Sequence, residues 1–152
     1  MRDLDKYPNP VESARILLVE DSRLELYRLE ALLKGFQFDT ISCSQPSDAL
    51  QILLAEHIDI VLCDWRMPDM SGLELCKTIN RSPAMGDPYF IMLTGRRERS
   101  DVIAAIDAGA DDFISKPAAG EELRARLQAG LRRLERERVL LERRRRLVNY
   151  VQ

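Results

Sequence analysis

Short apolar runs recur along the chain, and four of them lead directly into a polar residue. These runs cover residues 15–19, 58–63, 89–93 and 112–115. A further stretch, at residues 38–43, alternates between apolar and polar positions as a β-strand does. The run at 58–63 is continuous, which is typical of a central parallel strand covered on both faces. The pattern therefore predicts five strands.

The segments between these runs repeat their apolar residues at helical spacing, which predicts helices between the strands. Gly35 is expected to cap the end of the first helix, Ser47 to begin the second, and Ser100 or Asp101 to begin the fourth. The last helix is expected to begin near Ala119. The positions expected to face the core include Leu24, Leu29, Leu33, Leu53 and Leu54, and the fourth helix is expected to contain Ile103, Ala105 and Ile106.

Strands that alternate with helices in this way predict an α/β fold, with a parallel sheet between two layers of helices. Right-handed crossover connections then set the handedness of the fold. The sequence contains neither G-x-G-x-x-G nor G-x-x-x-x-G-K-[ST]. Dinucleotide and nucleoside-triphosphate sites therefore lack their usual sequence support.

The composition indicates one globular domain. The 152 residues are 45% apolar and 32% charged, and no apolar run approaches the length of a bilayer span. The three cysteines form no C-x-x-C pair, so neither a disulfide framework nor a zinc site is indicated. Residues 1–13 lack the apolar core of a secretion signal and are expected to form a flexible leader. We therefore expect a cytoplasmic protein with no membrane partner.

The polar residues that follow the strands are of types that suit phosphate chemistry. Glu20 and Asp21 follow the first run, Asp64 follows the run at the centre, and Thr94 and Lys116 follow the last two. Because the carboxyl ends of parallel strands share one edge, these five side chains are expected to converge on one crevice.

The chemistry of this set favours a magnesium ion and a phosphoryl group. Three carboxylates repel one another unless a cation lies among them, and oxygen ligands with open water positions suit Mg²⁺. Lys116 adds a positive charge, and the hydroxyl of Thr94 can donate a hydrogen bond to a phosphoryl oxygen. Asp64 ends the central strand, so it is the carboxylate best placed to act as a nucleophile and form an acyl phosphate.

Five motifs together resemble the receiver domain of bacterial two-component response regulators, the CheY-like domain, over residues 14–130. They are Leu-Leu-Val-Glu-Asp-Ser at 17–22, Asp-Trp-Arg-Met-Pro-Asp-Met-Ser-Gly-Leu at 64–73, Leu-Thr-Gly at 93–95, Gly-Ala-Asp-Asp-Phe at 109–113 and Lys-Pro at 116–117. The resemblance implies a doubly wound, flavodoxin-like sheet with strand order 2-1-3-4-5. It also implies a signalling phosphoacceptor, not an enzyme with its own small substrate.

The resemblance further implies how the acids divide the chemistry. Asp64 matches the residue that accepts a phosphoryl group from a histidine kinase. Glu20 and Asp21 match the acidic pair that holds Mg²⁺ together with Asp64, and the backbone carbonyl of Arg66 matches a further ligand. These residues form the expected metal site.

The remaining motif positions match the phosphoryl-binding and switch residues of the family. Thr94 and Lys116 would bind the phosphoryl oxygens. Phe113 matches the switch aromatic, which turns inward when the hydroxyl of Thr94 moves toward the phosphate. A phenyl ring has no hydroxyl to keep in water, so its burial costs no polar group. Lys116 and Pro117 would be joined by a cis peptide.

Two arginines depart from the plainest pattern of the family. Arg66 and Arg96 lie two positions after Asp64 and Thr94. They either influence the lifetime of the phosphate or are solvated charges, and the sequence leaves both readings open. A phosphohydrolase with an aspartyl nucleophile would normally have a second acid at the position of Arg66. An inert interaction scaffold is the third reading, and the intact set of site residues argues against it.

The final helix is predicted to continue beyond residue 131 as a helical extension over residues 131–152. Ten Arg and five Glu lie in residues 121–152. Arg138 and Arg145 interrupt one apolar position of a heptad pattern. The apolar positions of this pattern are Leu127, Leu131, Leu134, Leu141 and Val148.

This extension resembles a coiled-coil helix that links a receiver to an output domain, such as a diguanylate cyclase. We therefore expect a homodimer through this helix, and a fragment of a longer regulator whose output domain is absent from the chain. The alternative is a basic tail that binds nucleic acid. Interleaved Glu residues and the scarcity of aromatic side chains for base stacking argue against that alternative.

Overall fold

A computed structural model describes residues 14–95 and 99–151 of the chain. The predicted leader at residues 1–13 and Arg96 lie outside the described residues. Strands and helices alternate along the described part. The strands are β1 (Arg15–Val19), β2 (Asp39–Cys43), β3 (Ile60–Asp64), β4 (Tyr89–Thr94) and β5 (Asp112–Ser115). The helices are α1 (Arg23–Gly35), α2 (Pro46–Ala55), α3 (Gly72–Asn80), the 3₁₀ turn η2 (Pro83–Met85), α4 (Arg99–Ala108) and α5 (Gly120–Val151).

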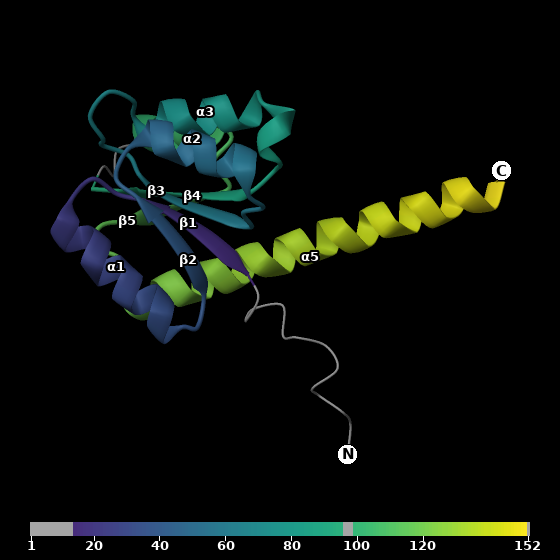
Figure 1. Cartoon of the computed structure of the whole chain (residues 1–152), viewed down its shortest axis with the longest axis horizontal. Helices are drawn as coiled ribbons and strands as arrows, with labels where there is room; N and C mark the ends of the chain where they lie inside the picture. The colour runs from purple at the N-terminus through teal and green to yellow at the C-terminus, as the bar shows by residue number, and fades with distance from the viewer. Residues whose placement is uncertain (1–13, 96–98, 152) are drawn as a thin grey trace, which may run out of the picture.

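The five strands form one parallel sheet in the order β2-β1-β3-β4-β5. The predicted doubly wound order is therefore confirmed. Helices α1 and α5 cover one face of the sheet and α2 and α3 the other (Figure 1). β3 lies at the centre of the sheet and is buried along its whole length, as its continuous apolar run predicts.

Side chains of each strand alternate between two separate cores, one on each face of the sheet. In β3, Ile60 and Leu62 pack toward α1 and α5, whereas Val61 and Cys63 pack toward α2, α3 and α4. Cys63 therefore packs into the core on that face of the sheet. Both faces of the central strands are buried in apolar cores. Polar side chains can therefore be accommodated at the strand ends.

Three predicted helix ends differ from the structure by a few residues. Gly35 stays inside α1 and Gln37 takes the left-handed conformation, with φ of 67°. The second helix begins one residue before Ser47, because Pro46 fits the first turn, where an N–H has no helical partner. Arg99 is already helical, so Ser100 and Asp101 lie within α4 and do not precede it.

Two apolar residues predicted to face the core, Leu24 and Leu54, and two apolar residues of α4 are exposed in the structure. Leu24 is 83% exposed, Leu54 57%, Ile103 51% and Ile106 64%. In a doubly wound sheet each helix contacts the sheet along a narrow line, and the flanking apolar positions remain in solvent. The buried positions on these helices are Leu29, Leu33, Pro46, Ala49, Leu53, Ala105 and Ala108.

Helix α5 is 32 residues long and extends well beyond the sheet (Figure 1). Leu123 and Leu127 are buried against the sheet. At Gly130 the helix passes so close to Tyr89 that a Cβ atom would lie 2.7 Å from the ring. From Leu140 to Tyr150 every side chain is exposed. Within residues 14–95 and 99–151, no helix combines the length and the apolar character needed to cross a bilayer.

Candidate functional site

The carboxyl edge of the sheet brings together the five polar residues predicted to form the crevice. Glu20 and Asp21 directly follow β1, and Asp64 is the last residue of β3. Thr94 is the last residue of β4, and Lys116 directly follows β5. Because all strands run in parallel, residues up to 96 positions apart come within hydrogen-bonding distance.

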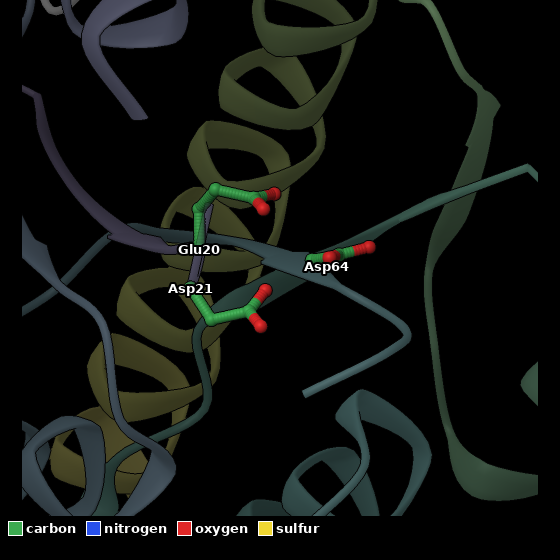
Figure 2. Close-up of side chains that lie close together, drawn as sticks. All are labelled: Glu20, Asp21 and Asp64. Atoms are coloured by element: carbon green, nitrogen blue, oxygen red, sulfur yellow. The ribbon is translucent and has the colours of Figure 1, made fainter. Parts of the chain in front are cut away.

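Three carboxylates share one small volume at this edge. Oxygen atoms of Glu20, Asp21 and Asp64 all lie within 4.8 Å of one another. The side chains of Glu20 and Asp21 extend toward Asp64 (Figure 2). Glu20 is 1% exposed and Asp64 is 7% exposed, whereas Asp21 faces solvent. Hard oxygen donors at such spacing, open to water on one side, suit Mg²⁺ in their chemistry.

Lys116 places its ammonium group between two of these acids. Its Nζ lies 2.9 Å from Oδ1 of Asp64 and 3.1 Å from Oε2 of Glu20. The backbone N–H of Ser22 donates to the other oxygen of Glu20 at 3.2 Å. The cation thus offsets part of the repulsion between two buried carboxylates.

Burial and neighbouring charges shift the pKa values of both Glu20 and Lys116. Burial raises the pKa of Glu20, the charge of Asp64 raises it further, and Lys116 opposes this shift. Burial alone would lower the pKa of Lys116, but its hydrogen bond with Asp64 and the charges of Asp64 and Glu20 outweigh burial and raise it. Lys116 therefore remains a cation at neutral pH.

A cavity of about 280 Å³ opens beside Asp64. It is lined by Asp64, Arg66, Thr94, Gly95 and Lys116. Its wall therefore combines one carboxylate, one hydroxyl and two cations. This combination can hold a tetrahedral oxyanion next to the carboxylate.

Two features near the cavity bear on the predicted switch. Phe113 is half-buried, and its ring meets that of Trp65 edge-on at a centroid distance of 6.3 Å. The backbone N–H of Lys116 donates to the carbonyl of Thr94 at 2.8 Å. The peptide between Lys116 and Pro117 is cis, as the resemblance implies.

The first residue of α3, Gly72, was not predicted to matter. At Gly72, a Cβ atom would overlap the carbonyl oxygen of Asp64. The N–H of Gly72 donates to the carbonyl of Trp65 at 2.8 Å, so the loop closes directly under the acid. Gly72 belongs to the motif at residues 64–73, which could have drawn attention to it. Its role depends on a contact with Asp64 that the sequence does not show.

Comparisons with known proteins agree with this geometry. The family model described as the response regulator receiver domain matches residues 16–128. The phosphate regulon transcriptional regulatory protein PhoB of Rhizobium meliloti (strain 1021) is 40% identical over 128 residues, which cover 81% of this chain and 54% of that protein. The chain thus spans about half the length of the curated relatives it matches.

Solved structures show the same fold. The signal receiver domain of an HD domain-containing protein from Pseudomonas fluorescens Pf-5 is 27% identical, with a TM-score of 0.78 over 88% of this chain and 97% of that chain. A probable two-component system response regulator/GGDEF domain protein is 27% identical, with a TM-score of 0.75 over 82% of this chain and 52% of that chain. With its sheet order, strand-end residues and sequence matches, the chain belongs to the response regulator receiver domain family, a family of signalling domains.

Proposed function

We propose that the protein is a phosphoacceptor whose Asp64 takes a phosphoryl group from a phosphohistidine of a histidine kinase. The observation that carries this proposal is the ammonium of Lys116, held 2.9 Å from Asp64 at the mouth of an oxyanion-sized cavity. Asp64 is 7% exposed, so it is open to a donor yet shielded from bulk water. A carboxylate nucleophile beside a cation is suited to form an acyl phosphate.

In this proposal Glu20, Asp21, Asp64 and the backbone carbonyl of Arg66 hold a magnesium ion. The close approach of three carboxylates supports the assignment, because such a group is unfavourable without a cation. When bound, Mg²⁺ supplies positive charge that offsets the negative charge on the phosphoryl oxygens.

The chain's own side chains divide the work of transfer. A carboxylate oxygen of Asp64 attacks phosphorus while the P–N bond of the donor breaks, and the imidazole nitrogen leaves. Lys116 balances the charge that gathers on the phosphoryl oxygens, and the hydroxyl of Thr94 donates a hydrogen bond to one of them. The protein promotes its own phosphorylation and the slow loss of the phosphate, and it releases no small-molecule product of its own.

Phosphorylation would alter the surface of the molecule through Thr94 and Phe113. Movement of the hydroxyl of Thr94 toward the phosphate leaves space behind it, and the half-buried ring of Phe113 turns into that space. The acyl phosphate thus stabilises one of two existing conformations of the α4–β5–α5 region.

The long α5 helix would transmit this change to an output domain. PhoB of Rhizobium meliloti is described as a transcriptional regulator, and one structural neighbour joins a response regulator to a GGDEF domain. We favour the second arrangement, with a diguanylate cyclase joined through α5 and a homodimer formed along this helix. The exposed apolar side chains of its outer half support the dimer. The cytoplasmic location expected from the sequence belongs to the same proposal.

The decisive experiment is phosphorylation with acetyl phosphate and Mg²⁺, followed by intact mass. We expect the parent protein to gain one phosphoryl group per chain and the Asp64→Asn variant to gain none. Asp48→Asn, a matched change at an exposed position of α2, should behave as the parent does. No mass gain in the parent, or an equal gain in Asp64→Asn, would contradict the proposal.

The same experiment separates the phosphoacceptor from a phosphohydrolase. A phosphohydrolase would release many equivalents of inorganic phosphate per chain and accumulate no covalent adduct. A phosphoacceptor holds a single equivalent, which is lost slowly after the donor is removed.

A further inference from the structure

Arg28, on the second turn of α1, reaches the loop that carries Lys116. Its Nη1 donates to the carbonyl oxygen of Ala118 at 3.1 Å, although the two residues are 90 positions apart. Ala118 lies two residues after Lys116 and is 3% exposed. A buried carbonyl needs a hydrogen-bond donor. Arg28 therefore satisfies this carbonyl and fixes the loop at that point.

Glu25 holds the guanidinium of Arg28 in the orientation that this contact needs. Nη2 and Nε of Arg28 lie 2.6 and 3.2 Å from the two carboxylate oxygens of Glu25. Such a two-pronged pair uses one edge of the planar group and leaves Nη1 free for another acceptor. Nη1 donates one hydrogen bond to the carbonyl of Ala118.

Two further contacts join α1 to the segment after Lys116. A Cβ atom on Gly120 would lie 3.3 Å from the side chain of Leu32. The guanidinium of Arg124 lies 5.8 Å from the centre of the ring of Phe36. Helix α1 begins just after the acidic pair at the carboxyl end of β1, so these contacts hold the acids and the Lys116 loop in one arrangement.

The ammonium of Lys116 depends on this arrangement because it is carried on a long, flexible side chain. Its backbone is held on one side by the hydrogen bond from its N–H to the carbonyl of Thr94 at 2.8 Å. On the other side, Arg28 holds the carbonyl of Ala118. Loss of the second contact would free the loop that sets where the ammonium lies.

The pair between Arg28 and Glu25 also neutralises the carboxylate of Glu25. The hydrogen bond from Arg28 is the main cause that lowers the pKa of Glu25, and the charge of Lys116 lowers it further. Glu25 is therefore an ionised partner that holds the guanidinium of Arg28 in place.

We propose that Arg28, oriented by Glu25, is a positioning residue, which acts through Ala118 to keep the ammonium of Lys116 between Asp64 and Glu20. Its consequence for phosphoryl binding rests on the function proposed above. Its consequence for cation binding does not, because it follows from the charge of Lys116 alone.

The test measures two affinities of the Arg28→Ala variant, both followed through the fluorescence of Trp65, the single tryptophan. Beryllofluoride, a phosphoryl analogue, should bind roughly tenfold more weakly, as for the loss of one charge-assisted hydrogen bond. Mg²⁺ should bind roughly twofold or more tightly, since displacement of Lys116 removes a repelling cation from among the acids. A general loss of structure would instead weaken the binding of both beryllofluoride and Mg²⁺.

Three further variants sharpen the result. Arg28→Lys keeps a donor for Ala118 but cannot form the two-pronged pair, so it should restore part of the beryllofluoride affinity. Glu25→Gln removes the charge that orients the guanidinium, so it should weaken beryllofluoride binding in the same direction as Arg28→Ala. Arg126→Ala is the matched control, because Arg126 is 42% exposed, against 37% for Arg28, and pairs with Asp112 at 2.9 Å. It should leave both affinities unchanged.

The outcomes distinguish this inference from the proposed function. Weaker beryllofluoride binding together with tighter Mg²⁺ binding in Arg28→Ala supports the positioning role. Unchanged beryllofluoride binding, or Mg²⁺ binding that is unchanged or weaker, overturns it. If the parent itself binds no beryllofluoride, the proposed function fails, and the Mg²⁺ affinity of Arg28→Ala still decides the role of Arg28.

Discussion

At the end of β3, the backbone that carries Asp64 lies against the first residue of α3. A Cβ atom on Gly72 would overlap the carbonyl oxygen of Asp64 and lie 3.1 Å from Cα of Trp65. Backbone atoms cannot turn aside as the end of a flexible side chain can. The missing side chain at Gly72 therefore allows the loop to close beneath the acid.

Replacement of Gly72 by Ala should move the end of β3. We expect the free energy of unfolding to fall by about 2 kcal/mol, as for overpacking in a tight interior, and Mg²⁺ to bind more weakly because Asp64 is displaced. Gly35→Ala is the control, since nothing lies within 4 Å of a Cβ atom there, and Ala in a helix should stabilise by up to about 1 kcal/mol. Urea unfolding measures the stability of both variants. Equal midpoints for the two variants would refute the argument.

At the scale of one element, α5 changes character along its length. Its first turns pack Leu123 and Leu127 onto the sheet. Leu141 and Val148, each 58% exposed, continue the seven-residue spacing of Leu127 and Leu134 into solvent. Arg138, which interrupts the pattern, pairs with Glu135 and Glu142 of the same helix. An exposed helix with such an apolar line is stabilised by pairing with another helix.

We therefore expect the protein to form a dimer along the outer half of α5. Leu141→Glu combined with Val148→Glu should weaken the dimer at least about tenfold, because it places like charges in the apolar line. Tyr150→Glu is the matched control, because Tyr150 is 90% exposed and lies on the other side of the helix. Light scattering over a range of concentrations measures the effect. A parent that stays monomeric with and without beryllofluoride contradicts the dimer.

At the scale of the whole molecule, the three thiols lie in or against one core, between the sheet and helices α2, α3 and α4. Burial raises the pKa of Cys43 from 9.0 to about 11 and that of Cys76 to about 12. Burial also raises the pKa of Cys63. All three therefore remain protonated at neutral pH and act as small apolar side chains.

These shifts predict a loss of stability in alkali. The unfolded chain releases its thiol protons near the ordinary pKa of 9.0, whereas the folded protein keeps those of Cys43 and Cys76 to about 11 and 12. The thiol contribution is therefore complete below pH 9 and is lost as the pH rises from there to about 12. Urea midpoints should fall over this range more steeply in the parent than in the Cys43→Ala, Cys76→Ala double variant. An equal pH dependence in both would contradict the prediction.

The sequence predicted most of the sheet because its signal is local. The continuous run at 58–63 and the runs at 15–19 and 89–93 are apolar for the length of a strand, and burial on both faces requires that pattern. The outward positions of Leu24 and Leu54 were missed, because helical spacing indicates an apolar face but does not show how wide a line the sheet covers. Ser47 was wrongly predicted to begin the second helix, which begins at Pro46 because proline fits the first helical turn.

The sequence by itself determined the alternation of strands and helices, and the residue types at the strand ends, because both depend on neighbours along the chain. It thereby determined which five side chains could meet at the carboxyl edge. Only the tertiary structure decided that the ammonium of Lys116 lies between Asp64 and Glu20, that Gly72 lies against Asp64, and that Arg28 reaches Ala118. These contacts join residues far apart in sequence, and their distances depend on how strands and helices pack, which no local pattern contains.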